Sequence, residues 1–239
     1  MITNLMLRAL PALALAALPV LATPLPAVAD VSHVQRTQLQ GAPGPSTQVL
    51  LTLFEAIDQI PVAAEHREGY SRTLYKHWNK GLNPSDGCNT RKEVILTEAV
   101  EAPQIAAGCA LTGGSWLSPY DGVVVTDAAR LDVDHFVPLA EVYDSEQTPW
   151  SPARREAYAN DQDSPDTLIA VTAASNRSKS DKDPAEWLPS DASYHCTYAT
   201  TWVGTKLRWN LAADEDERQA LLGLGEDCPT ALVSYEPVP

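Results

Sequence analysis

Two short polar segments contain residues whose types suit metal-assisted hydrolysis. Residues 132–138 read D-V-D-H-F-V-P, and residues 176–181 read N-R-S-K-S-D. In the first segment, the carboxylate of Asp134 is an oxygen ligand for a hard cation, and His135 is a base that can be neutral near pH 7. Asn176, in the second segment, adds a neutral oxygen ligand. Together the two segments predict a one-metal site that cleaves phosphodiesters.

The roles in this predicted site follow from the ligand types. Asp134 and Asn176 are expected to bind a divalent metal ion, with Mg²⁺ as the first expectation and Mn²⁺ or another ion as alternatives. His135 is expected to take a proton from the attacking water. Departure of the 3′ oxygen predicts 5′-phosphate and 3′-hydroxyl product ends. Taken singly, an Asp-His pair is more often a surface or capping pair, and an asparagine more often a turn or helix cap.

Acidic and basic neighbours are candidates for supporting roles. Asp132 is expected to orient His135 or to brace its strand, and a ligand role stays open. Asp181 is expected either next to the metal ligands or as the cap of a following helix. Arg91, within the run C-N-T-R, either clamps the scissile phosphate or forms a salt bridge in the fold.

The net charge of −14 argues against simple nucleic-acid binding, because phosphate-binding proteins usually carry net positive charge or a basic stripe. A catalytic groove needs only local positive charge, and acidic residues can serve solubility outside the cell. Phosphate contacts are therefore sought in local basic groups, against the alternative of a solvated charged turn. These groups are Arg177 with Lys179 and Lys182, and Lys206 with Arg208.

The elements that must position the site can be read from the hydrophobic pattern. A strand is predicted to reach His135, and Pro138 limits its continuation. Residues 151–160 predict a helix, and residues 167–172, T-L-I-A-V-T, predict a second strand. Asn176 comes just after that strand, so pairing of the two strands would bring it close to the Asp-His pair.

Other segments predict mostly helices. A helix is expected from residue 49 to Pro61, another can open at residues 184–188, and a last one spans residues 214–224. Residues 123–125, V-V-V, predict a short buried strand. An aromatic face at helical spacing is expected to fill the core instead of stacking on bases. That face consists of Tyr198, Trp202 and Trp209, with Lys206.

The N-terminus predicts export. Residues 1–29 have a lone arginine, an apolar run and an A-V-A site, which are typical of a secretory signal peptide. The run is shorter than the roughly 20 residues of a membrane span and contains two prolines, and nothing later is apolar enough to span a bilayer. Residues 30–46 are expected to be a flexible leader, and residues 47–239 one folded domain.

The four cysteines fit an exported chain, in which an even count usually means disulfides. Three pairings are possible. We expect Cys88 with Cys109 and Cys196 with Cys228, because each pair brackets a compact local segment and each closed loop could contribute about 3 kcal/mol. A zinc site is disfavoured because the chain has no C-x-x-C motif.

The two polar segments resemble those of HNH endonucleases, including the HNH domain of RNA-guided CRISPR effectors. Over a wider span, residues 61–228 resemble secreted bacterial HNH-family proteins related to the C-terminal domain of GmrSD-type restriction enzymes. The shared features include G-C-N-T-R, S-P-Y-D-G, L-D-V-D-H and D-P-A-E-W-L-P. The resemblance implies a ββα-metal core at about residues 123–189, with His135 as general base and Asp134 and Asn176 as metal ligands.

The fold class expected from these patterns is α+β, a mainly helical, disulfide-stabilised single domain around a ββα-metal core. The expected function is a secreted endonuclease that acts on DNA through one metal ion. Two alternatives stay open: a catalytically inactive, nuclease-like extracellular binding module, and an antibacterial nuclease toxin. The sequence leaves open DNA against RNA, strand and sequence preference, and oligomeric state.

Overall fold

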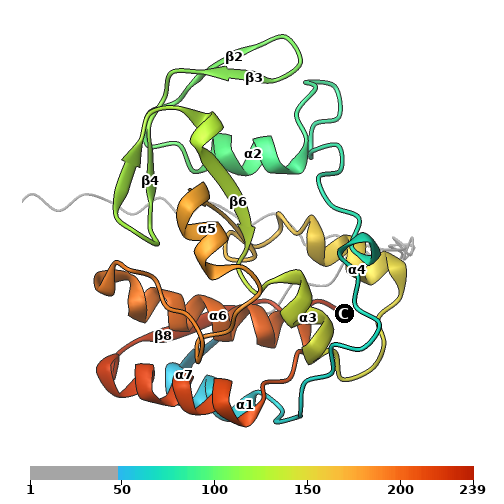
Figure 1. The fold of residues 1–239 in the computed structure, drawn as a ribbon, viewed down its shortest axis with the longest axis vertical. Coiled ribbons are helices and arrows are strands. Elements are labelled where there is room, and N and C mark those ends of the chain that lie inside the picture. The colour runs from blue at the N-terminus through green and yellow to red at the C-terminus, as the bar shows by residue number, and fades with distance from the viewer. Residues whose placement is uncertain (1–47) are drawn as a thin grey trace, which may run out of the picture. The chain divides into compact units, whose positions relative to one another are not determined.

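A computed structural model of the chain describes residues 48–239, which form a mixed fold of helices and short strands (Figure 1). The predicted signal peptide and leader, residues 1–29 and 30–46, lie outside the described residues. Within the described part, no helix is both long enough and apolar enough to cross a membrane.

The described strands form four antiparallel pairs. They are β1 (Val49–Thr52) with β8 (Leu232–Tyr235), β2 (Gln104–Ala106) with β3 (Ala110–Thr112), β4 (Trp116–Ser118) with β5 (Val123–Val125), and β6 (Leu131–His135) with β7 (Leu168–Thr172). The α-helices are α1 (Leu53–Gln59), α2 (Thr90–Thr97), α3 (Leu139–Ser145), α4 (Pro152–Ala159), α5 (Ala173–Lys179), α6 (His195–Trp209) and α7 (Glu215–Asp227). Short 3₁₀ turns occur at Arg72–Leu74, Ala128–Arg130 and Ala192–Tyr194.

The pair β6–β7 and the helix α5 that directly follows β7 form a ββα unit in the middle of the view in Figure 1. Leu131 and Val133 are buried in a core that also contains Val94 and Ile95 of α2. Because side chains alternate along a strand, Asp132 and Asp134 lie on the opposite face of β6. The helix α5 packs against β6 and β7, so the alternation turns both aspartates toward α5.

The larger core lies where α1, α6, α7 and β8 pack together, below the ββα unit in Figure 1. Tyr198, Trp202 and Trp209 are buried there, as the helical spacing predicts. The expected disulfides are both present: Cys88 is bonded to Cys109 and Cys196 to Cys228. The second bond joins the start of α6 to the end of α7.

Three expectations for local structure are wrong. The helix expected from residue 49 begins only at Leu53, because the preceding residues pair with β8, a partner too distant in sequence for periodicity to reveal. Residues 123–125 do form a strand, but Val123 and Val124 are exposed and only Val125 is buried. Residues 184–188 form no helix; backbone N–H groups there donate to the carboxylate of Asp183, which holds a turn.

The half-buried carboxylate of Glu98, beside β7, makes the folding stability depend on pH. Burial raises the pKa of Glu98 from 4.5 to about 7, although the backbone N–H of Ala170 donates to its Oε2 at 2.9 Å and opposes this rise. Between pH 4.5 and about 7 the folded protein keeps a proton on Glu98 that the unfolded chain has released. The contribution of Glu98 to folding stability therefore falls as pH rises from 4.5 to 7, by up to about 3 kcal/mol.

We expect Glu98→Gln to lose this component, because the amide keeps an acceptor for Ala170 without titrating. Urea unfolding at pH 5 and pH 8 measures this effect as the difference in the free energy of unfolding between the variant and the wild type. The variant should gain stability over the wild type at pH 8 and not at pH 5. An equal difference at both pH values would contradict the assignment.

Candidate active site

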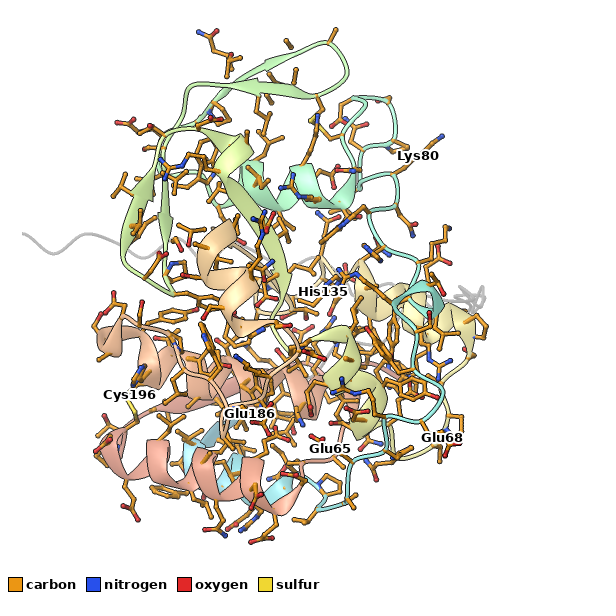
Figure 2. All side chains as sticks on the ribbon, viewed as in Figure 1. Glu65, Glu68, Lys80, His135, Glu186 and Cys196 are labelled. Carbon is orange, nitrogen blue, oxygen red and sulfur yellow. A yellow bond between two sulfur atoms is a disulfide. The ribbon has the colours of Figure 1, made fainter. Side chains whose placement is uncertain are left out.

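A cavity of about 470 Å³ opens at the end of β6 and the start of α3. Figure 2 shows His135 at this end of β6. All three residues expected to do chemistry line the cavity, together with a neighbouring arginine of α5 and two residues from the irregular segment before α2. These residues are Asp134, His135, Asn176, Arg177, Tyr70 and Arg72.

Asp134 is held in place from two sides. The Lys179 ammonium donates to its Oδ2 at 2.6 Å, and the Tyr120 hydroxyl donates to the same oxygen at 2.8 Å. Burial raises the pKa of Asp134, and these two donors oppose the rise. Both contacts use Oδ2, so Oδ1 forms no hydrogen bond with the residues that the structure describes.

His135 is positioned by ring packing and one hydrogen bond. Its ring stacks between Trp78 and Tyr158, with centroid distances of 5.2 and 6.2 Å. Trp78 has a φ of 60°, an uncommon conformation for a bulky residue. Nε2 lies 3.0 Å from the carbonyl oxygen of Ala159; because a carbonyl only accepts, Nε2 carries the hydrogen and Nδ1 the lone pair. Burial lowers the pKa of His135 to about 3, so the ring is neutral at pH 7.

Asn176 lies on the first turns of α5, where its side chain meets Asp132. Its Nδ2 donates to Asp132 Oδ2 at 3.5 Å, the long end of hydrogen bonding, and its Oδ1 has no hydrogen bond with the described residues. Asp132 contacts Asn176, and the structure does not bring it to His135 as an orienting role would require, because Asp132 and His135 lie on opposite faces of β6.

Arg91 contacts the strand β6 and stabilises it. Its guanidinium donates to the carbonyl oxygen of Leu131 at 2.6 Å and lies 3.9 Å from Asp132 Oδ1. Of its two expected roles, the salt bridge within the fold fits the structure, since Arg91 does not line the cavity. Arg177 lies 3.9 Å from the other oxygen of Asp132, with 78% of its side chain exposed.

The other basic candidates differ in their surroundings. Lys179, Lys206 and Arg208 are buried in ion pairs, and burial of this kind does not fit a phosphate contact in solvent. Lys182 donates to the carbonyl oxygen of Ser178 and does not line the cavity. Asp181 lines the cavity and pairs with Arg67 at 2.7 Å; no helix follows that it could cap.

Arg72 is the charged lining residue of the cavity that was not predicted from the sequence. It is exposed, lines the cavity, and forms no salt bridge with the described residues. Its electrostatic influence lowers the pKa of both Asp134 and His135. No spacing or motif marks this arginine, because it comes from an irregular segment some 60 residues before the strand it faces. Arg72 and Arg177 give the cavity positive charge in an acidic chain.

The donor set fits a hard divalent cation. Asp134 Oδ1 and Asn176 Oδ1 are oxygen atoms of residues that line one cavity, and hydrogen bonds engage the neighbouring atoms of both side chains while leaving these oxygens free. A carboxylate and an amide oxygen are ligands that Mg²⁺ accepts, with water completing the shell.

The buried pair of Lys179 and Asp134 gives a prediction for stability. Lys179→Met should cost about 3–5 kcal/mol, because it leaves the Asp134 carboxylate buried without its cation. Urea unfolding measures this, with Lys182→Met, which removes an ammonium outside the site, as the control. The double variant Lys179→Met with Asp134→Asn should recover part of the loss. A single variant as stable as the wild type would show that the pair does not support the site.

A comparison with family models identifies one family for this chain. Residues 75–224 match the family model described as "GmrSD restriction endonucleases, C-terminal domain". A protein of Arthroderma benhamiae, described as an "uncharacterized secreted protein", is 36% identical over 184 residues, which cover 77% of this chain and 87% of the relative. No solved structure matches the chain significantly. The matched region contains every residue discussed above for the cavity except Tyr70 and Arg72.

Proposed function

The chain belongs to the family of GmrSD restriction endonuclease C-terminal domains, and we propose that it is a secreted nuclease that uses HNH-type chemistry with one divalent metal ion. Family membership supports a nuclease-related function. The observation that carries the finer proposal is the shared cavity of Asp134, His135 and Asn176. The ββα unit of β6, β7 and α5 supplies all three residues.

His135 is the general base in this proposal. Its Nδ1 has the lone pair, so it can accept a proton from a water molecule in the cavity. The carbonyl oxygen of Ala159 holds the other nitrogen and fixes the tautomer. After proton transfer this carbonyl stabilises the cationic ring, as does the negative charge of a bound phosphodiester.

Asp134 and Asn176 would hold the metal ion, through the oxygens that are free of hydrogen bonds. When bound, a divalent ion supplies charge that offsets the growing negative charge on the phosphate and on the departing 3′ oxygen. Lys179 and Tyr120 hold the Asp134 carboxylate through its Oδ2, and Asp132 orients the amide of Asn176. With these supports the ligands need little rearrangement on binding.

The substrate we propose is DNA outside the cell. Arg72 and Arg177 line the cavity next to the base and can bind the phosphate backbone. A base-reading module is not evident in the described residues, which fits cleavage with little sequence preference. The protein is secreted, in agreement with its two disulfides and with the description of the Arthroderma benhamiae relative.

The test is cleavage of supercoiled plasmid by the purified protein with Mg²⁺, with Mn²⁺, and with EDTA. We expect nicked and then linear DNA with either metal ion and intact plasmid with EDTA. DNA ligase should reseal the nicks, since HNH-type cleavage leaves 5′-phosphate and 3′-hydroxyl ends. Plasmid that stays intact across several divalent metals, and RNA that also stays intact, would favour a binding module over an enzyme.

A further inference from the structure

A second group of carboxylates lies next to α3, outside the nuclease cavity. It consists of Glu65, Glu141 and Asp144, whose ligand atoms all lie within 4.8 Å of one another. Glu141 and Asp144 are buried, with 1% and 2% exposure, while Glu65 comes from the irregular segment between α1 and α2 and is exposed. Figure 2 shows Glu65 beside α3. None of the three residues lines the cavity of the candidate active site.

The two basic residues that contact this group, Lys206 and Arg67, each contact a carboxylate outside it as well. Lys206 donates to Glu141 Oε1 at 2.7 Å, but it also donates to Glu217 at 2.5 Å. Arg67 donates to Asp144 Oδ2 at 2.5 Å, but it also donates to Asp181 at 2.7 Å. Two cations thus serve four carboxylates before Glu65 is counted.

Glu65 has no salt bridge within the described residues, and its side chain contacts that of Glu141. Two carboxylates in contact need either a shared proton or a cation between them. Asp214 adds further negative charge; it belongs to a neighbouring carboxylate group that also contains Asp183 and Glu217.

An independent observation concerns Asp144. Its Oδ1 is buried and has no hydrogen-bond partner, and only one other buried side-chain atom in the described residues, the hydroxyl of Tyr198, is in the same situation. Buried oxygens almost always have a partner, because leaving one without a partner is costly. Arg67 already holds Oδ2, so Oδ1 is the atom left for a ligand. A cation is a partner that a carboxylate oxygen among other carboxylates can take.

We infer that Glu65, Glu141 and Asp144 form a Ca²⁺ site that is separate from the nuclease metal site. The donors are all carboxylate oxygens, without histidine or cysteine, which suits a hard cation. Ca²⁺ accepts irregular oxygen sites better than Mg²⁺, which demands near-ideal octahedral geometry, and binding sites in extracellular modules have dissociation constants of about 10⁻⁴–10⁻³ M. The inference does not depend on the proposed nuclease activity.

The site would fasten the segment that carries Arg72. Glu65 and Arg72 belong to the same irregular segment, whereas Glu141 and Asp144 belong to α3. An ion between them adds a cross-link between this segment and the helix, beside the ion pair of Arg67 with Asp144. Ca²⁺ should therefore stabilise the folded protein by binding to it and not to the unfolded chain.

The experiment is thermal unfolding of the EDTA-treated, desalted protein with and without CaCl₂. At about 2 mM Ca²⁺ the midpoint of the wild type should rise by roughly 3–6 °C. Glu65→Gln should abolish this rise, and because Glu65 is exposed the variant should fold. Glu68→Gln, an exposed carboxylate on the same segment, and Asn176→Ala, which removes a proposed nuclease ligand, should keep it.

Calorimetric titration with CaCl₂ gives a second readout, in which Glu65→Gln should lose the binding heat and Asn176→Ala should retain it. A wild type without a Ca²⁺-dependent rise or binding heat would overturn the inference. So would a response that survives Glu65→Gln but is lost in Asn176→Ala, because the ion would then lie in the nuclease cavity. If the Ca²⁺ response is lost in Asp214→Asn but kept in Glu65→Gln, the ion lies in the neighbouring carboxylate group, and this too would overturn the inference. Plasmid cleavage is scored separately, so failure of either proposal can be recognised.

Discussion

His135→Ala is expected to reduce plasmid cleavage by about 10²- to 10⁴-fold, the usual contribution of a positioned general base. The lone pair on Nδ1 is lost, and no other described histidine lines the cavity. Single-turnover cleavage with Mg²⁺ measures the effect on the chemical step. Binding of Mg²⁺ should persist in the variant, since Asp134 and Asn176 remain.

The variant also removes a ring that packs between Trp78 and Tyr158, so a loss of folding must be separated from a loss of chemistry. Circular dichroism checks the fold, and added imidazole can occupy the space left by the ring. We expect imidazole to restore part of the activity. His195→Gln, on α6 and outside the cavity lining, serves as the control and should cleave like the wild type. A folded His135→Ala variant with wild-type rates would remove His135 from the mechanism.

Asn176→Ala is expected to raise the Mg²⁺ concentration for half-maximal cleavage by at least about tenfold, because loss of even an indirect support of a ligand costs 10- to 100-fold in metal affinity. The substitution removes an amide oxygen without disturbing the buried core, since Asn176 is only partly buried on α5. Cleavage rates measured over a Mg²⁺ series give this concentration directly.

Asn176→Asp is the matched comparison, because it keeps an oxygen at the same position and adds negative charge. It should need less Mg²⁺ than Asn176→Ala for half-maximal cleavage. An unchanged Mg²⁺ dependence in both variants would show that Asn176 does not bind the ion, and the proposal would then need another ligand for Asp134.

Much of the ββα unit could be predicted from the sequence because its signals are local. Alternating apolar residues mark β6, an apolar run marks β7, and both strands are where the pattern places them. The disulfides were predictable for the same reason, since each closes a short loop. The helix α3 was not predicted, because its start directly after Pro138 has no capping side chain to mark it.

The supports of the site were harder to predict because they come from distant segments. Tyr120 and Trp78 approach Asp134 and His135 from loops without periodicity, and only the folded chain brings them together. Lys179 is different. It follows Asn176 by three residues, which places both on one face of α5. A buried lysine facing a buried aspartate was therefore within reach of helical spacing, but the charged run N-R-S-K-S-D suggested a solvated turn.

Asp134 and Asn176 are proposed to bind one metal ion in the cavity that His135 also lines. Anomalous diffraction from a crystal soaked in Mn²⁺ tests it most directly, because Mn²⁺ can replace Mg²⁺ and its position can be seen. We predict a peak in the cavity within roughly 2–2.5 Å of an Asp134 carboxylate oxygen and the Asn176 amide oxygen. No peak there at saturating Mn²⁺, or a peak that contacts neither residue, would contradict the account.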